Sequence, residues 1–303
     1  MTITRAQFME LMEPKLSNIW HEAYPQQPVE YTLFVNIRTT QKATITDFKM
    51  TDFGSLRLKG EGENIIYDDP IAGPTKQYQP MRFALGYKVT QEMVDHEQYG
   101  QVARLESALM KSAIDGQEIS AARLLNNAFS TTSTDEYTAT GFDGLALCAT
   151  AHTRLDGGAT FGNRPSTDVD LGVTALQNAL IAFDNLKDDR GRPSRIRPVR
   201  LLISPEDQFT AEELLGSELK PGTANNDKNA LRGKLSYSVL HYKTDTDAWF
   251  IQGDKHDMNL IWDVRPRTAM QEDFDAEVIK RKVVQGYAVG FGEVRGIYGS
   301  TGI

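Results

Sequence analysis

The longest helical pattern in the chain runs from Thr90 to Phe129, and it constrains the fold more than any other segment. Thr90 suits the N-cap position, because its hydroxyl can accept hydrogen bonds from the unpaired amides of a first turn. Between Gly100 and Phe129 only Gly116 interrupts strong helix formers, and a glycine inside a helix costs about 1 kcal/mol relative to alanine. At a rise of about 1.5 Å per residue this segment would span roughly 45 Å, more than twice the length of a typical helix.

One face of this expected helix is apolar and the opposite face is polar. At about 100° per residue, the apolar arc predicts contact with a core. Its members are Val102, Leu105, Leu109, Met110, Ala113, Ala121, Leu124 and Ala128. The residues expected on the solvent side are Arg104, Lys111, Asp115, Glu118 and Asn126. Glu106 and Gln117 fall inside the apolar arc, so each needs a hydrogen-bonding partner or a less buried position.

Composition excludes several classes of protein. With 303 residues and 40% hydrophobic content, the chain can bury a sizeable core and is expected to form two or more lobes. The net charge of −8 argues against tight nucleic-acid binding, and the basic clusters at residues 190–200 and 280–282 suit solvated or interface charges. No apolar run reaches the length needed to cross a bilayer, so no membrane partner is expected.

The chain contains a single cysteine, Cys148. One thiol excludes an intrachain disulfide framework and a multi-cysteine metal site, and it suits the reducing cytoplasm. Cys148 lies in the apolar string LALCAT, which predicts a small buried hydrophobe and argues against a nucleophile.

The first third of the chain predicts a helix, several strands and a projecting hairpin. Residues 3–22 have apolar positions at helical spacing, and the pattern leaves open whether they pack on their own domain or reach out as an arm. Residues 31–58 alternate as strands do. A hairpin follows, with arms at residues 56–58 and 64–67 and a polar, glycine-rich tip at residues 60–63. Since exposed strands aggregate unless they are paired, we expect another copy of the chain to be the partner.

Five charged residues of this hairpin form the candidate subunit interface: Arg57, Lys59, Glu61, Glu63 and Asp68. Their alternating signs suit charge complementarity between copies. An ion pair across the interface is the expected role of Lys59, with a covalent isopeptide bond as the minor alternative.

Motifs that would indicate catalysis or a cofactor are absent. The sequence has no GxSxG elbow, phosphate-binding loop, HExxH motif or EF-hand loop, so no catalytic, cofactor-binding or metal-binding residue is predicted. Asp254, His256 and Asp257 would bind a metal only with a further ligand, and such short acidic turns are mostly solvated. His152 and Asp156 suit a general base in a glycine-rich loop, but without a nearby nucleophile a loop-stabilising hydrogen bond is the better interpretation.

After the long helix, helices and strands alternate irregularly. Helices are expected at residues 173–188 and 205–217, and a terminal pair of long strands within residues 258–300. This order lacks the βαβ rhythm of a doubly wound sheet and predicts an α+β fold.

The chain resembles the major capsid proteins of tailed bacteriophages with the Hong Kong-type fold, in particular the Mu-like major head subunits. The strings that carry the resemblance are VTQEMVDHEQYG with AARLLNNAF, GFDGLALCATAH, LGVTALQNALIAFDNLKDDRGRP, LLISPEDQFTAEELL, NNDKNALRG, DTDAWFIQG and VGFGEVRGIYGS. Their order covers nearly the whole chain, and they are specific as a set.

The resemblance implies a fold with a long spine helix, a peripheral and an axial domain, an N-terminal arm and an extended hairpin loop. The implied division is 1–44 for the arm and first strands, 45–75 for the extended hairpin loop, 76–140 for the peripheral domain with the spine helix, 141–250 for the axial domain, and 251–303 for the return strands of the peripheral domain. No long helical segment precedes the arm, so we expect a separate scaffolding protein if assembly requires one.

The implied function is that of a structural major capsid protein, not an enzyme, that self-assembles into hexamers and pentamers of an icosahedral head shell. Its implied partners are other copies of itself, a scaffolding protein, a portal, and packaged viral DNA that is enclosed without tight binding. Its place would be the virion capsid, assembled in the bacterial host cytoplasm. The alternatives are an encapsulin-like shell around protein cargo and, more distantly, a metal-dependent hydrolase.

Overall fold

The computed structural model describes residues 14, 16–90, 92–93, 99–134, 137–219, 227–273 and 278–303. In chain order the elements are η1 (Tyr24–Gln26), η2 (Tyr31–Leu33), β1 (Asn36–Thr39), β2 (Ile45–Met50), β3 (Ala72–Tyr78), β4 (Met81–Thr90), α3 (Tyr99–Asn126), β5 (Tyr137–Thr138), α4 (Val173–Asp184), β6 (Pro198–Ile203), η3 (Pro205–Asp207), α5 (Gln208–Gly216), β7 (Ser236–Val239), β8 (Trp249–Gly253), β9 (Met258–Asp273), β10 (Val278–Phe291) and β11 (Ile297–Ser300). This mixture of helices and strands confirms the α+β prediction.

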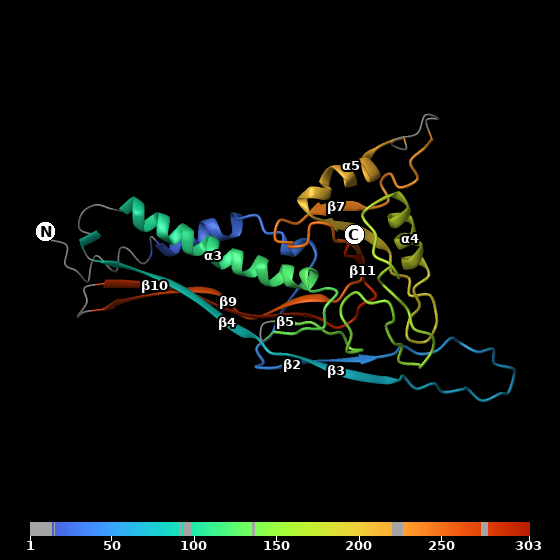
Figure 1. Cartoon of the computed structure of the whole chain (residues 1–303). Helices are drawn as coiled ribbons and strands as arrows, with labels where there is room; N and C mark the ends of the chain where they lie inside the picture. Colours follow the sequence, from blue (N-terminus) through green and yellow to red (C-terminus); the bar gives the residue numbers. More distant parts are fainter. Residues whose placement is uncertain are drawn as a thin grey trace.

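Helix α3 is the long helix that the sequence predicts, with 28 residues and a length of about 42 Å, although Thr90, the expected N-cap, is the last residue of strand β4. It lies along one face of a large sheet (Figure 1) whose strand order is β1-β9-β10-β4, with β5 paired to β10. Leu109, Met110 and Leu124 of the predicted apolar arc are buried there. The prediction that Glu118 faces solvent is wrong, because the segment around η2 covers it and leaves it 4% exposed.

The two polar residues of the apolar arc, Glu106 and Gln117, are both completely buried and both have partners. Glu106 pairs with Arg281 of β10, and Gln117 donates a hydrogen bond to the side chain of Gln285, also on β10. These contacts give α3 a fixed position along β10, since a shift of the helix would leave buried polar groups unpaired.

The segment before η1 packs on this same chain. Residues 16–23 are helical, and Leu16 and Trp20 are 4% and 5% exposed against α3, β4 and β10. The described part of the N-terminal segment therefore covers the molecule's own core, which was one of the two alternatives that the sequence left open.

A second, smaller sheet has the order β11-β8-β6-β7 and packs against α4 and α5. Strand β8 joins the two cores, because its side chains alternate: Trp249 and Ile251 lie in the core beneath α4, while Phe250 points into the core beneath α3. Strand β11, the last in the chain, belongs to this second sheet and not to the pair of long strands before it.

The predicted hairpin exists, but its paired strands lie nearer the body than expected. Strands β2 and β3 form a two-stranded antiparallel ladder, and residues 51–71 between them contain no strand. The predicted arms at residues 56–58 and 64–67 are therefore wrong as strands. The predicted tip does turn, with the Glu63 amide donating to the Gly60 carbonyl at 3.3 Å. We call residues 51–71 the extended loop; it projects from one end of the molecule (Figure 1).

Candidate assembly surface

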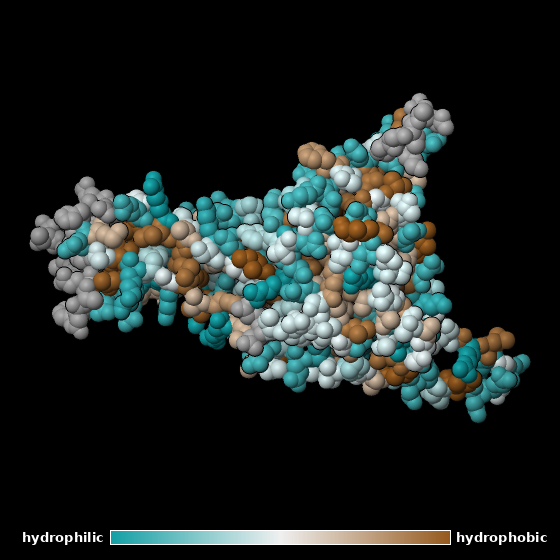
Figure 2. All heavy atoms as spheres, in the orientation of Figure 1, coloured by the Kyte–Doolittle hydropathy of each residue, from teal (hydrophilic) through white to brown (hydrophobic). Residues whose placement is uncertain are grey.

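The extended loop exposes six large apolar side chains. Leu56 and Leu58 are completely exposed, and Phe53, Ile65, Ile66 and Tyr67 are 62–89% exposed. Figure 2 shows hydrophobic and hydrophilic side chains mixed along this projection. Exposed apolar side chains gathered in one segment mark an interaction site, and residues 51–71 have no strand ladder to pair most of their backbone. The loop is therefore built for contact with another surface.

The five predicted interface residues divide into two groups. Arg57, Lys59 and Glu61 are exposed and form no hydrogen bond or ion pair within the described part of the chain. Glu63 accepts a hydrogen bond from the Gly60 amide at 2.9 Å and shapes the tip. Asp68 stabilises the other end of the loop.

Asp68 accepts a hydrogen bond from the Gly54 amide at 2.6 Å, which joins the two arms of the loop. That hydrogen bond, and then the charge of Arg190, hold the pKa of Asp68 below its ordinary value. At the neck, the Thr51 amide donates to the Ile71 carbonyl at 3.0 Å, and the Ile71 amide donates to the Thr51 hydroxyl at 2.9 Å. Hydrogen bonds therefore set the shape of the loop at its neck and tip, while the residues between these points stay exposed.

Arg190 holds the neck of the loop against the second core. It lies in the turn after α4, and its guanidinium donates to the Thr51 hydroxyl at 3.2 Å and to the Asp69 carbonyl at 2.6 Å. Its distance to the Asp68 carboxylate is 3.6 Å. The sequence predicts solvated or interface charges in this basic turn. Arg190 instead has a role within the chain, because its contacts fix the direction in which the loop projects.

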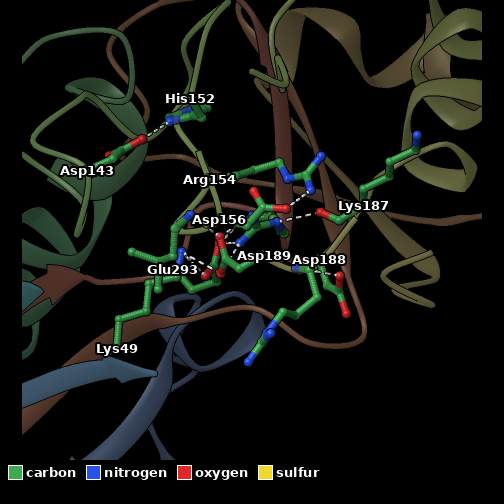
Figure 3. A network of polar contacts seen from close by, with 12 residues as sticks. Lys49, Asp143, His152, Arg154, Asp156, Lys187, Asp188, Asp189 and Glu293 are labelled. Atoms are coloured by element: carbon green, nitrogen blue, oxygen red, sulfur yellow. Dashed lines mark hydrogen bonds and ion pairs between the residues drawn. The ribbon is translucent and has the colours of Figure 1, made fainter. Parts of the chain in front are cut away.

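A buried ionic network lies behind this contact, at the base of the hairpin (Figure 3). Lys49 of β2 lies 3.1 Å from Asp189 and 2.8 Å from Glu293, and the Arg295 guanidinium binds the same two carboxylates at 2.8 and 2.9 Å. Burial alone would raise the pKa of Asp189, but Arg295 and Lys49 outweigh it and lower that pKa. Two cations and two anions thus tie β2 to the α4–β6 turn and the β10–β11 turn.

Lys76 fixes the other strand of the hairpin. Its ammonium donates to the carbonyls of Thr140 and Phe291 and lies 4.5 Å from the centre of the Phe291 ring. Burial lowers the pKa of Lys76 to about 8, because the charged form loses water. No local pattern indicates this role, since a lysine in a strand with exposed neighbours is ordinarily solvated.

The candidate enzyme sites have structural roles. His152 Nδ1 lies 2.6 Å from the Asp143 carboxylate and its Nε2 lies 2.9 Å from the Asn163 side-chain oxygen, so it holds a loop together. Asp156 pairs with Arg154 and not with His152. The predicted loop-stabilising role of His152 is confirmed, with a different carboxylate as its partner.

The other residues considered from the sequence are Asp254, His256, Asp257 and Cys148. Within the described residues, no group of three or more histidine, cysteine, aspartate or glutamate side chains is arranged to hold a metal, and Asp254, His256 and Asp257 form none. Cys148 is 1% exposed, and burial raises the pKa of its thiol, which makes it a poor nucleophile. No helix in the described ranges is long and apolar enough to cross a membrane.

Comparison with known families places the chain. A family model described as "Phage capsid protein" matches residues 73–300, well over half of the sequence. Among curated proteins, no sequence matches.

Solved capsid structures share the fold. The capsid of an empty GTA particle has a TM-score of 0.57 at 10% identity, covering 88% of this chain and 87% of that chain. The bacteriophage JBD30 capsid has a TM-score of 0.55 at 14% identity, covering 71% and 91%. A virus-like particle from Pyrococcus furiosus has a TM-score of 0.51 at 9% identity, covering 95% and 98%. These likenesses confirm the predicted capsid fold.

Proposed function

This chain belongs to the phage capsid protein family, and from that membership we propose that its copies assemble into hexamers and pentamers that close an icosahedral head shell. It is a structural protein of the virion capsid, and it associates with copies of itself. The family match favours this role over a shell around protein cargo and over a hydrolase. The observation that carries the proposal is the extended loop, whose exposed Leu56 and Leu58 need a surface on another subunit.

The proposal extends to the other components of a head. The shell encloses packaged viral DNA without binding it tightly, because a net charge of −8 opposes phosphate contact over most of the surface. A scaffolding protein and a portal take part in assembly, which occurs in the host cytoplasm. Nothing in these roles requires catalysis by this chain.

The proposed domain division places the extended hairpin loop at 45–75 and the peripheral domain with its spine helix at 76–140, continued by return strands in 251–303. The axial domain comprises 141–250. Support for the axial unit comes from α4, β6, α5 and β7, which share the second core, with β11 completing its sheet. Residues 1–44 form the arm and first strands.

The test reverses the charges of Lys59 and Glu61 (Lys59→Glu with Glu61→Lys). We expect the yield of particles, measured by analytical ultracentrifugation and negative-stain microscopy, to fall while the circular dichroism of the subunit stays unchanged. The matched control keeps the sign of each charge at the same positions (Lys59→Arg with Glu61→Asp), and it should assemble normally. Normal particles from the reversed variant would remove these residues from the interface, and a wild-type chain that never assembles would refute the shell itself.

A further inference from the structure

The basic cluster between α4 and β6 divides into arginines that the chain uses internally and arginines that it leaves exposed. Arg190 binds the neck of the extended loop, and Arg192 pairs at 2.8 Å with a carboxylate four residues before it. Arg195 and Arg197 are exposed, and neither forms an ion pair with any residue that the structure describes. The internal role of the cluster therefore accounts for only part of it.

Two lysines lie next to the exposed arginines. Lys187 pairs with Pro193, two residues before Arg195, in an isolated β-bridge, and in Figure 3 its ammonium points away from the carboxylates near it. The Arg197 carbonyl accepts a hydrogen bond at 2.8 Å from the amide of the residue before Lys255. Both lysines are exposed and have no ion pair within the described ranges. We call Lys187, Arg195, Arg197 and Lys255 the basic patch.

The basic patch lies on a rigid framework. The Lys187 carbonyl accepts a hydrogen bond from the guanidinium of the buried Arg295 at 2.8 Å. An added Cβ at Gly296 would clash with the Lys255 carbonyl, so the turn that carries Lys255 packs directly on the β10–β11 turn. These fixed backbone positions keep the cations together, so a ligand meets a surface that is already in place.

Arg195 has a backbone conformation that favours glycine. Its φ is 54°, in the left-handed region, and it is the only non-glycine residue with a positive φ among those that the structure describes. A side chain is strained in this region, because its Cβ approaches the following carbonyl. The chain thus keeps an arginine where glycine would relax its own fold. Strain of this kind at an exposed position indicates a role outside the folded subunit.

The carboxylates near the basic patch are already engaged. Asp254 accepts a hydrogen bond from the Arg197 amide at 2.9 Å and forms no ion pair with the Arg197 guanidinium. Asp188 and Asp189 pair with two other arginines, at 2.8 Å each. The basic patch therefore keeps a local excess of positive charge on a chain whose net charge is −8.

The surroundings of the basic patch contain little to attract a protein. Residues 185–198 and 253–257 expose no large apolar side chain. A protein interface has an apolar core from which lysine and other charged residues are depleted. Four cations without such a core suit a polyanion, which binds through its charge and releases counterions as it does so.

The spacing of the two arginines fits a nucleic-acid backbone. Arg195 and Arg197 are two residues apart, so their Cα atoms lie within about 7 Å of each other. One strand of duplex DNA has a phosphate about every 3.4 Å along the axis, and guanidinium groups suit phosphate oxygens. We propose that the basic patch binds the phosphate backbone of the packaged duplex DNA, an inference that rests on the proposed shell function. The side of the subunit that carries the patch then faces the interior of the shell.

Binding by one basic patch is weak and sensitive to salt. Each neutralised phosphate contributes about 0.9 to the slope of log affinity against log salt concentration, so four cations give at most about 3.6. Affinity should then fall on the order of 100-fold when the salt concentration rises from about 50 to about 200 mM. A shell presents many copies of the patch, so weak contacts act together while each one releases easily as DNA enters.

The test measures the binding of a random-sequence DNA duplex to the dilute full-length subunit, by fluorescence anisotropy over this range of salt. Arg195→Gln with Arg197→Gln should weaken binding at least tenfold at about 100 mM salt and reduce the slope by about 1.8, because two phosphate contacts are lost. Arg195→Lys with Arg197→Lys keeps both charges and should keep the slope. The matched control is Arg104→Gln with Lys111→Gln on the exposed side of α3, which removes the same charge and should leave the slope unchanged.

Arg195→Gly separates a phosphate contact from a structural role. Glycine adopts the backbone conformation at this position without strain, so the variant should unfold at no lower denaturant concentration than the native subunit. It should nevertheless reduce the slope of DNA binding by about 0.9. A glycine variant that unfolds more easily and binds DNA like the native subunit would give Arg195 a structural role and overturn the proposal.

Two further results would overturn the proposal and leave the shell function intact. One is an unchanged slope in Arg195→Gln with Arg197→Gln, above all if the particle yield falls, which would assign the basic patch to a contact between subunits. The other is an equal loss of slope in the α3 control, which would show attraction to net charge alone. A native chain that never assembles would instead refute the proposed function, whatever its DNA binding.

Discussion

The buried polar residues beneath α3, which we call the seam, and the extended loop differ in whether their side chains find partners within the chain. The seam consists of Glu106 and Gln117 of α3 with Arg281 and Gln285 of β10, all 4% exposed or less. Each of these polar groups has a partner within the chain. The extended loop, in contrast, leaves apolar side chains in contact with water, and Leu56 is completely exposed.

The difference separates stability from assembly. Polar groups that are buried and paired inside one chain set the position of α3 on its sheet, so their loss should destabilise the subunit. Apolar groups left in water gain nothing in the subunit and become favourable only when another surface covers them. Substitutions in the two regions should therefore affect different measurements.

The largest effect on stability is expected from Arg281→Ala. Arg281 is 2% exposed and pairs with Glu106 at 3.0 Å. Without Arg281, the Tyr87 hydroxyl is the partner that Glu106 would keep among the described residues. Removing one member of a buried pair typically costs about 3–5 kcal/mol, because the other charge stays buried. Denaturant unfolding of the dilute, unassembled subunit measures this loss.

Two controls sharpen that experiment. Lys282→Ala changes the neighbouring residue on the exposed side of β10 and should alter the free energy of unfolding by no more than about 0.5 kcal/mol. Replacing both partners by apolar residues, with Arg281→Met and Glu106→Leu, should recover most of the stability. An Arg281→Ala subunit as stable as the native one would show that the seam does not fix α3.

A smaller, pH-dependent effect is expected from Glu118→Gln. The Glu118 carboxylate accepts hydrogen bonds from the amides of Glu30 and Tyr31 at 2.6 and 3.0 Å, and the Glu30 carboxylate in turn accepts one from the amide of the exposed His241. Burial raises the pKa of Glu118 from 4.5 to about 7; those two hydrogen bonds oppose the shift, and the negative charges of Glu30 and Asp115 add to it. The native state therefore keeps a proton that the unfolded state loses.

The sign follows from proton linkage. A carboxyl group whose pKa is raised in the folded state stabilises the folded subunit fully below pH 4.5. That stabilisation disappears as the pH rises through about 7. Between pH 5 and pH 8 the native subunit should lose on the order of 2 kcal/mol more unfolding free energy than Glu118→Gln, which cannot ionise. Parallel curves for the two proteins would contradict the assignment. His241→Asn, which removes the imidazole beside Glu30, is the matched control.

Local sequence patterns predicted elements better than they predicted contacts. The periodicity of α3 was sufficient for its length and for its apolar arc, because a helix face is a property of consecutive residues. It failed at Glu118, which lies on the polar side of the pattern but is covered by residues 30 and 31. Only the tertiary path of the N-terminal segment decides that cover, and no periodicity within α3 reports it.

The candidate interface shows the same limit. The sequence predicted a projecting, charged hairpin, and its glycine-rich tip was a local signal. It also predicted strands at residues 56–58 and 64–67, because alternating apolar residues favour strands, but the ladder ends at Met50 and Ala72. The anchoring roles of Arg190 and Lys76 could not be found in this way, since their partners lie far away in the sequence.

The smallest effect on stability is expected from Leu56→Ser with Leu58→Ser. Both side chains are already completely exposed, so the unfolding free energy of the subunit should change by less than about 0.5 kcal/mol. The assembled fraction should nevertheless fall at least tenfold, because each leucine covered at an interface contributes about 1.5–3 kcal/mol. Leu56→Met with Leu58→Met, which keeps the apolar volume, should assemble normally. A serine variant that unfolds at lower denaturant would place these leucines in the subunit's own core, and one that assembles normally would leave the extended loop without a role in the shell.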